Sequence, residues 1–583
     1  MIQHFDKLQT PLRCVNVYPL LQDQQRRFVD GGWPLIAVRS LWDLWGDSQF
    51  LRPEQRIALN AVEPFDEWEE FALFASHYFL LVATKPSEPN INHGYIGPYQ
   101  RQLIEYSTEE DALRAVGKLR LSLTLRYQDN PNGRGRRRFG AVMKTATRIV
   151  GHHGGLGTQT RLNSTDVYMD GEMNNVTWNN PPVSVAARMC HTITQLNKED
   201  YLLAGGRTSP GNALADCWLR RSQSWERVDD LPLPRYRHCA TQVSIGNGGS
   251  SILVSGGKNS VGTVLADYVI WRTGSGWQTV RVTGDAPRPR FGATMIAINR
   301  TSGILVGGMT EDGVILSECW RWFIENHDKV ITIIFQDQSQ PRLLFPGSDC
   351  FMARFGASLE QSPLGLLYIG GVSDQGLIPR KYEIVVVRPG TCTIPAPEAG
   401  LCEATQFERV DLVCDGPRPL LVGHMVATAG AEKLLILGGG AVCFSFGTYW
   451  NLGIWTLQNG IDLSGTSWHL CDIVEVVPPT RPVVSAAIPP SGNGDSHPSV
   501  PHLTTIGRVR VASPRAFEAI VTEAYPVVME GLDIGSCTKT WTIDYLSETV
   551  GASRQVCLEC ICDDVDDQAN ANRSLCTKLP QII

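Results

Sequence analysis

The sequence predicts a mainly β fold built around a ring of six similar units. Three observations lead to this prediction: Gly-Gly pairs that recur, an arginine-containing element before most pairs, and aromatic residues after them. The first four pairs are each 51 residues apart, and the later intervals are 63 and 68 residues. The pairs begin at Gly154, Gly205, Gly256, Gly307, Gly370 and Gly438. A repeat of this kind is one supersecondary unit that must stack on its neighbours to bury its apolar face.

Each repeat is predicted to form four short strands. Residues 241–244 and 251–255 are rich in β-forming residues and are separated by the turn-forming run Gly246–Gly249. A Gly-Gly pair allows backbones to approach closely where the second strand ends near the central axis. The aromatic side chain downstream is expected to fill the gap between neighbouring sheets. The aromatic residues are Tyr168, Trp218, Trp271, Trp320, Tyr382 and Trp450.

This combination of an apolar run, a Gly-Gly pair and a trailing aromatic at a period near 50 residues resembles the kelch repeat of β-propellers. The six copies, within residues 135–458, predict a six-bladed kelch-type β-propeller. Propellers include enzymes, adaptors and scaffolds, so the fold by itself does not decide the function.

The element before the Gly-Gly pairs begins with arginine in five copies. These residues are Arg138, Arg188, Arg237, Arg290 and Arg354, and the sixth copy has Val422-Gly-His424 instead. Since each arginine starts a strand, we expect several to converge on one face and bind substrate phosphates. The alternative is an arginine that pairs with an acidic loop of its own blade. The basic run Arg134–Arg138 is either a phosphate contact or a solvated linker.

The first 85 residues have a different composition from the repeats. Leu41-Trp-Asp-Leu-Trp45 precedes an acidic and aromatic run, Glu63–Glu70, in which Pro64 and the carboxylates suit the start of a helix. Residues 71–83 then become strand-like around residues 76–82. A helix followed by an apolar strand is a common end of an α/β domain.

The motifs HFDKLQTPLRCV, LWDLW and EPFDEWEEFALFASHYFLLVA resemble the end of the leucine carboxyl methyltransferase-like domain of the tRNA wybutosine-synthesizing protein 4 family. That family continues with a kelch propeller and a JmjC-type cupin domain. The resemblance implies S-adenosylmethionine-dependent methylation of a tRNA wybutosine precursor, and its methoxycarbonylation with carbon dioxide. It also implies a phenylalanine-type tRNA anticodon loop as the partner, a cytoplasmic location, and a propeller able to bind a protein partner.

The resemblance divides the chain into five parts. These are a C-terminal fragment of the methyltransferase-like domain (1–85), a linker with a helix (86–134), the kelch propeller (135–458), a Pro-rich linker (459–510), and a partial JmjC-like segment with a divergent tail (511–583). We therefore expect a propeller flanked by the C-terminal end of an α/β methyltransferase domain and by the start of a cupin/JmjC-like domain. Both flanking domains are expected to be truncated.

The residues that would bind S-adenosylmethionine are not recognisable. Such methyltransferases use a Gly-rich loop after a first strand, and the first 100 residues contain no Gly-x-Gly. No cofactor-binding or catalytic residue is therefore assigned. His77 and Tyr78 are expected either to line a substrate pocket or to have a structural role in the closing strand.

The C-terminal part resembles the opening of a JmjC-type domain through PVVMEGLDIG (526–535) and WTIDYLSETVG (541–551). Such domains hold iron with two histidines and a carboxylate. No histidine follows His502, so no metal site is expected. A group of four cysteines, Cys557, Cys560, Cys562 and Cys576, has a spacing that is irregular for zinc, and the adjacent acidic stretch is typical of a disordered tail.

Composition and charge exclude several classes of protein. The 583 residues include 52 Lys and Arg against 59 Asp and Glu, and this net charge of −7 argues against a generally basic nucleic-acid-coating protein. No apolar run predicts a membrane span, the start lacks the features of a signal peptide, and no membrane partner is expected. Scattered cysteines such as Cys190, Cys217 and Cys239 favour buried cytosolic thiols over disulfides.

Two functions from different classes remain. The first is a tRNA-modifying enzyme of wybutosine synthesis, supported by the motifs and the order of domains. The second is a non-catalytic kelch scaffold that presents loops to a protein or RNA partner. A secreted copper oxidase is disfavoured because the sequence has no clear group of Tyr and His ligands.

Overall fold

The protein was analysed as a computed structural model. It describes residues 5–6, 9–62, 65–84, 121–130, 135–146, 148–171, 175–221, 224–246, 249–327, 330–339, 352–376, 378–390, 405–429, 433–443, 447–459, 468–475, 507–510, 513, 517, 520, 527–530, 555–558 and 575–578. The chain forms two compact units, residues 1–479 and 480–583. In the second unit, β36 (Gly507–Arg510) pairs in parallel with β37 (Val527–Glu530), and β38 (Gln555–Leu558) pairs antiparallel with β39 (Leu575–Lys578).

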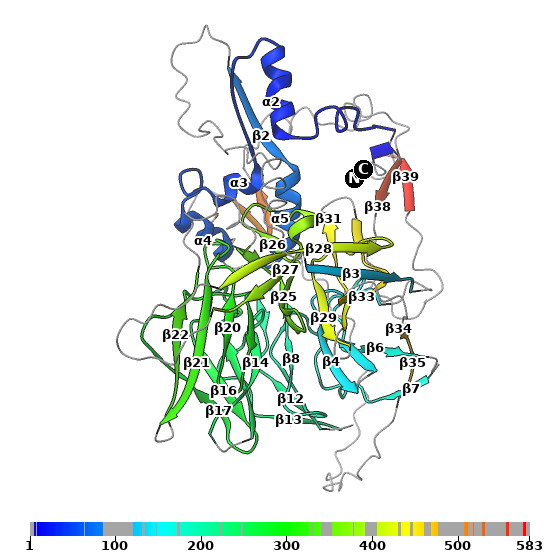
Figure 1. Cartoon of the computed structure of the whole chain (residues 1–583). Coiled ribbons are helices and arrows are strands. Elements are labelled where there is room, and N and C mark those ends of the chain that lie inside the picture. Colours follow the sequence, from blue (N-terminus) through cyan, green and yellow to red (C-terminus); the bar gives the residue numbers. More distant parts are fainter. Residues whose placement is uncertain are drawn as a thin grey trace, which may run out of the picture. The chain divides into compact units, whose positions relative to one another are not determined.

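Six groups of four antiparallel strands form the blades of the first unit (Figure 1). In order from the axis outwards, blades 1 to 3 are β4 (Ala141–Ala146), β5 (Ile149–His153), β6 (Thr165–Asp170) and β34 (Trp468–Leu470); β8 (Thr192–Gln195), β9 (Tyr201–Ala204), β12 (Cys217–Arg221) and β13 (Ser224–Val228); and β14 (Cys239–Ser244), β15 (Ser250–Ser255), β16 (Tyr268–Arg272) and β17 (Gly276–Thr279).

Blades 4 to 6 follow the same plan. They are β19 (Thr294–Ala297), β20 (Ser302–Val306), β21 (Cys319–His327) and β22 (Val330–Asp337), with β18 (Arg281–Thr283) added in parallel; β24 (Ser358–Ser362), β25 (Gly365–Ile369), β27 (Ile384–Arg388) and β28 (Gln406–Asp415); and β29 (His424–Thr428), β30 (Lys433–Gly438), β33 (Ile454–Asn459) and β3 (Leu121–Gln128). The first strands of neighbouring blades contact one another in a closed cycle, from β4 through β8, β14, β19, β24 and β29 back to β4. The mainly β propeller predicted from the repeats is therefore confirmed.

The Gly-Gly pairs close this ring through the backbone. In every blade both glycines have a positive φ, and the second N–H donates to a carbonyl of the next blade. The six bonds run from Gly155 to Arg188, Gly206 to Arg235, Gly257 to Arg290, Gly308 to Arg354, Gly371 to Leu421 and Gly439 to Arg137, with N···O distances of 2.8–3.0 Å. Apolar side chains fill the space between blades, as Leu253 of β15 and Trp322 of β21 do.

Two strands far apart in the sequence complete the first and last blades. Strand β3 is the outer strand of blade 6, and β34 is the outer strand of blade 1. Strand β28 links blades 5 and 6, because its second half pairs in parallel with β3. The propeller sheets thus include residues 121–128 and 468–470, which lie outside the interval 135–458 expected from the repeats.

Short two-stranded sheets occur in addition to the blades. They are β7 (Asn175–Trp178) with β35 (Asp472–Glu475), β10 (Arg207–Ser209) with β11 (Asn212–Ala213), β23 (Arg354–Phe355) with β26 (Val372–Ser373), and β31 (Gly440–Cys443) with β32 (Gly447–Trp450). A short 3-10 helix, η3, covers Arg380–Tyr382.

Residues 9–84, called the N-terminal segment below, contain α2 (Leu21–Asp30), β1 (Leu35–Ser40), α3 (Leu41–Gly46), α4 (Pro53–Val62), α5 (Trp68–His77) and β2 (Phe79–Thr84). Strands β1 and β2 form an antiparallel pair. The side chain of Ser40 caps α3 by accepting the N–H of Asp43 at 3.0 Å. The strand expected around residues 76–82 begins only at Phe79, because α5 continues to His77.

Helices α3 and α5 pack on the propeller (Figure 1). Trp42, Trp68 and Ala72 are in one buried cluster with Phe291 and Phe355 from blades 4 and 5. The described helices include none that is long and apolar enough to span a membrane.

The closure of the ring predicts a specific sensitivity at Gly256. An added Cβ there would collide with the carbonyl oxygen of Arg290, and its φ of 63° also disfavours a side chain. We expect Gly256→Ala to destabilise the protein by about 2–4 kcal/mol. Gly274→Ala is the matched control, because Gly274 has a φ of 78° and no atom within 4 Å of an added Cβ. Equal losses of thermal stability in the two variants would contradict the proposed close approach.

Candidate functional site

One arginine in each of five blades ties the start of the first strand to the end of the second. Its Nη1 donates to the carbonyl of the first glycine of the pair in the same blade, at 2.8–3.2 Å. The five residues are Arg137, Arg188, Arg235, Arg290 and Arg354. In blade 6 the amide of Asn451 takes this place and donates to Gly438 at 2.8 Å.

This set corrects the alignment of the repeats at two positions. The equivalent residues are Arg137 and Arg235, so Arg138 and Arg237 are displaced from the repeat position by one and two residues. Runs of neighbouring arginines in blades 1 and 3 hide the correct register in the sequence, since only the backbone pairing distinguishes them. Arg138 and Arg237 consequently have a different role.

The five candidate substrate-binding arginines are all buried. Arg138, Arg188, Arg237, Arg290 and Arg354 have exposed fractions of 0–8%. Arg188 pairs with Asp216 at 2.6 Å and Arg290 pairs with Glu318, as the alternative interpretation of an intrablade arginine expects. Arg354 donates to backbone carbonyls, including that of Tyr382 at 2.6 Å. At these five positions the structure presents no exposed guanidinium to a tRNA phosphate.

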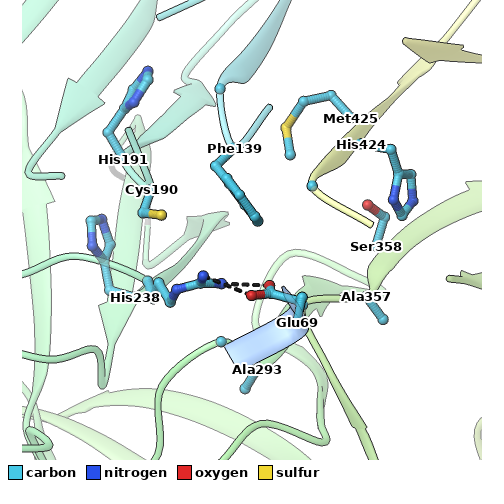
Figure 2. A pocket seen from close by; sticks show the side chains of 15 residues that line it. Glu69, Phe139, Cys190, His191, His238, Ala293, Ala357, Ser358, His424 and Met425 are labelled. Carbon is cyan, nitrogen blue, oxygen red and sulfur yellow. Dashed lines mark hydrogen bonds and ion pairs between the residues drawn. The ribbon is translucent and has the colours of Figure 1, made fainter. Parts of the chain in front are cut away.

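Six residues, one from each blade, form a second backbone ring around the axis, called the axial ring here. They are Phe139, Cys190, Arg237, Gly292, Gly356 and Gly423, all with φ between 53° and 69°. Each described N–H···O bond joins adjacent blades: Phe139 to Gly423, Cys190 to Phe139, Arg237 to Cys190, Gly292 to Arg237, and Gly356 to Gly292, at 2.8–3.0 Å. The ring lines a cavity of about 140 Å³ (Figure 2).

An acidic turn of the N-terminal segment enters this ring. Asp66, Glu69 and Glu70 are only 1–3% exposed. The guanidinium of Arg237 donates to Glu69 at 2.7 and 2.8 Å, as the dashed lines to Glu69 in Figure 2 mark. It also lies 2.5 Å from Asp66. Arg138 pairs with Glu70 at 2.6 Å. The three carboxylates and their arginines therefore form a buried ionic network, the acidic docking network.

Arg207 extends the acidic docking network to blade 2. Its guanidinium lies 2.7 Å from Asp66, and both side chains are buried. Buried ions lose their hydration, so each depends on its partner, and removal of one partner from such a pair typically costs 3–5 kcal/mol. The network is therefore a strong determinant of where the acidic turn sits.

The pKa values in this network follow from burial and from the neighbouring charges. Burial, together with the nearby Glu69 carboxylate, raises the pKa of Glu70 to about 7. Burial also raises the pKa of Glu69, although Arg237 opposes this effect. For Arg237, burial favours the neutral form, but Asp66 and Glu69 outweigh it and raise the pKa.

Further contacts hold the N-terminal segment to the outer loops of the propeller. The indole of Trp42 donates to the carbonyl of Ser373 at 3.2 Å, and Arg56 pairs with Asp312 at 3.1 Å. In blade 3, the ammonium of Lys258 donates to Asn60 at 2.9 Å. Residues 9–84 thus contact loops of several blades.

Three histidines near the axial ring do not form a metal site. Burial lowers the pKa of His191, of His238 to about 3 and of His424 to about 4, so their imidazoles are neutral. In Figure 2, the rings of His191 and His238 point away from Glu69. Among the described residues there is no group of three or more His, Cys, Asp or Glu able to hold a metal ion. The four C-terminal cysteines considered for zinc are not covered by this search, since Cys560 and Cys562 lie outside the described residues.

The cavity beside α2 in the N-terminal segment does not fit S-adenosylmethionine. A cavity of about 390 Å³ between α2 and the β1–β2 pair is lined by Gln24, Arg27, Phe28, Trp33, Phe79, Leu81 and Ala83. The cavity offers no carboxylate to the ribose hydroxyls, and the guanidinium of Arg27 would repel the positive sulfonium. His77 is exposed and its Nδ1 contacts the Leu73 carbonyl, outside this cavity.

Comparison with known proteins identifies the family. Residues 185–453 match the family model for the β-propeller of tRNA wybutosine-synthesizing protein 4. The protein of that name from Aspergillus fumigatus is 39% identical over 562 residues, which cover 95% of this chain and 51% of the relative. The chain belongs to the tRNA wybutosine-synthesizing protein 4 family.

Other relatives agree with this membership. The tRNA wybutosine-synthesizing protein 4 of Aspergillus oryzae is 40% identical over 565 residues, 95% of this chain and 53% of the relative. The protein of Emericella nidulans is 40% identical over 586 residues, again 95% of this chain and 53% of the relative. The chain spans about half the length of these curated relatives.

Sequence reasoning missed the acidic docking network. It interpreted the carboxylates of residues 63–70 as partners of a helix dipole, whereas Asp66, Glu69 and Glu70 pair with propeller arginines. A clue is present at the axial ring, where three repeats have glycine and the others have Phe139, Cys190 and Arg237. When a residue with a side chain occupies a position that favours glycine, that side chain is expected to have a structural or functional role.

The raised pKa of Glu70 predicts a pH-dependent stability. A folded-state pKa of about 7 against an unfolded value of 4.5 means that the folded protein binds this proton more tightly. The free energy of unfolding should therefore fall as pH rises from about 4.5 to 7, by on the order of 3 kcal/mol from this group. In denaturant titrations across this range, Glu70→Gln should lose that part of the decline.

Glu226→Gln is the control, because the Glu226 side chain is 51% exposed and pairs with Arg221 at the surface. It should keep the slope of the unmodified protein. A slope for Glu70→Gln equal to that of the unmodified protein would show that Glu70 is ionised in the folded state.

Proposed function

We propose that this chain takes part in tRNA modification during wybutosine synthesis, as the propeller and the adjoining end of a methyltransferase-like domain. The observation that carries the proposal is the 39–40% identity to tRNA wybutosine-synthesizing proteins over 95% of the chain. The substrate is a tRNA with a phenylalanine-type anticodon loop. The reactions of the complete enzyme are S-adenosylmethionine-dependent methylation and methoxycarbonylation of the side chain of the wybutosine precursor, in the cytoplasm.

The surface of the N-terminal segment supports its assignment to a larger α/β domain. Twelve of the 21 exposed large apolar side chains in the described chain belong to residues 9–84. Leu35, Leu80 and Val82 lie on one face of the β1–β2 pair, and each is at least 38% exposed. A two-stranded sheet with an uncovered apolar face is marginal by itself in water, and further strands or helices stabilise it.

The chain's own contribution to the reaction is to hold the methyltransferase-like domain in place on the propeller. No residue of the cavity beside α2 is assigned to cofactor binding. The acidic docking network fixes this segment on the rigid propeller, so the methyltransferase-like domain keeps one orientation relative to the propeller. A fixed geometry of this kind contributes to rate by holding the reacting groups in line.

The second candidate is a non-catalytic kelch scaffold that binds a protein or an RNA. The closed six-blade ring favours it, because contacts between neighbouring blades of this chain complete the ring. Under this alternative the chain binds its partner and has no effect on the chemistry of wybutosine synthesis. The JmjC-like assignment of residues 511–583 also stays a proposal.

A segment exchange tests the proposed function. In a fungal strain that expresses the Aspergillus fumigatus protein as its sole tRNA wybutosine-synthesizing protein 4, the segment that aligns with this chain is replaced by residues 1–583. We expect wybutosine to be retained in digested tRNA, as measured by liquid chromatography and mass spectrometry. The parent protein and a strain without the gene provide the upper and lower controls.

Loss of wybutosine in a strain that contains normal amounts of the folded chimera would contradict the enzyme role and favour the scaffold. Accumulation of the unmethylated precursor would identify the affected step. Expression is verified by immunoblot, and folding by the protease resistance of the propeller.

A further inference from the structure

The backbone of the axial ring does not by itself determine the rotational setting of a segment bound on its axis. Its six positions are equivalent by backbone conformation, because all six have a positive φ and the described N–H···O bonds link one to the next. A segment placed on the axis of such a ring meets six similar backbone environments. Within the ring itself, only the side chains distinguish one rotational setting from the five others; outside it, Arg138 and Arg207 add contacts to Glu70 and Asp66.

Three of the six positions carry side chains at a backbone conformation that favours glycine. Phe139, Cys190 and Arg237 have φ of 56°, 56° and 53°. An L-residue in this region is less stable than in its preferred conformation, because its Cβ comes too close to the following carbonyl oxygen. The three residues come from consecutive blades 1, 2 and 3, so the side chains occupy one half of the ring and glycines the other half.

The side chains of the first half bind the acidic turn directly. The guanidinium of Arg237 contacts Asp66 and Glu69, and its Cζ lies over the rings of Phe139 and Phe355, at 5.0 and 4.8 Å from their centroids. The Sγ of Cys190 lies 3.9 Å from Asp66. Each aromatic face attracts the guanidinium electrostatically and so helps to hold it in place.

One glycine of the other half, Gly356, leaves room that the acidic turn needs. A Cβ at Gly356 would collide with Oε1 of Glu69, and a Cβ at Gly292 would collide with the ring of Phe355. A helix turned by one blade would place its carboxylates against a different combination of these six positions. Its charges would then be buried away from Arg237.

We propose that Arg237, together with Phe139, Cys190 and the glycines opposite them, selects one of six rotational settings for the N-terminal segment on the propeller. Arg237 is a positioning residue in this account. The identity of what is oriented, a methyltransferase-like domain, rests on the proposed function, whereas the selection itself is a property of the described chain.

Photocrosslinking of the full chain reads the rotational setting directly. Trp45 lies against Gly313 in the loop of blade 4, where its indole donates to the Gly313 carbonyl at 3.4 Å. Replacing Trp45 with benzoylphenylalanine should give crosslinks within residues 309–315. In Arg237→Gly, the fraction of crosslinks in the equivalent loops of other blades, such as residues 258–264 and 207–213, should rise about tenfold or more.

Arg235→Lys is the matched control. Arg235 is two residues away in the same blade and is also buried, but its partners Asp267 and Gly256 belong to the propeller. This variant should lower stability and keep the crosslinks within residues 309–315. A variant that only loses stability therefore gives fewer crosslinks, but still within residues 309–315. A variant that loses rotational selection gives crosslinks in the loops of other blades.

Crosslinks confined to residues 309–315 in Arg237→Gly would overturn the proposal. If that variant does not fold, the double substitution Asp66→Asn with Glu69→Gln leaves the propeller sequence intact, and it must give the same spread of crosslinks. The tRNA experiment is independent: a chimera that makes no wybutosine, with crosslinks that spread as expected, would refute the function and leave the selection intact.

Discussion

A backbone N–H of one blade can donate to a carbonyl of the next blade only where the two backbone segments come close. The Gly-Gly pairs allow this close approach six times around the axis. The arginines of five blades and Asn451 of the sixth then hold the carbonyl of the first glycine in place. These bonds bring the first strands of all blades to the axis. The axial ring, and with it the binding of the acidic turn, depends on that closure.

The acidic turn is the part of the N-terminal segment that is buried inside the propeller. Asp66, Glu69 and Glu70 are buried among arginines of blades 1, 2 and 3, so their charges are compensated only in this docked position. Apolar contacts of Trp42 and Trp68 add non-directional stabilisation. The charges determine the placement, since a misplaced carboxylate would lose both its hydration and its partner.

The periodic features of the fold were predictable from the sequence, and the pairings between distant residues were not. The Gly-Gly pairs mark the six blades because their positive φ and close backbone approach together favour glycine. Strands β3 and β34 occur once each, outside the repeats, so no periodicity reveals them. The role of Arg237 was hidden for a similar reason, since Arg235 and Arg237 are equally plausible repeat residues until Asp66 and Glu69 are placed beside one of them.

Hydrogen exchange measured by mass spectrometry on the intact chain tests the central claim most directly, namely that the acidic turn is bound as firmly as the axis itself. The account predicts that amides of α5, residues 68–77, exchange as slowly as those of the Gly-Gly pairs. Exchange of α5 orders of magnitude faster than that of a protected Gly257 or Gly308 would contradict it. That result would mean that the segment detaches while the ring stays closed.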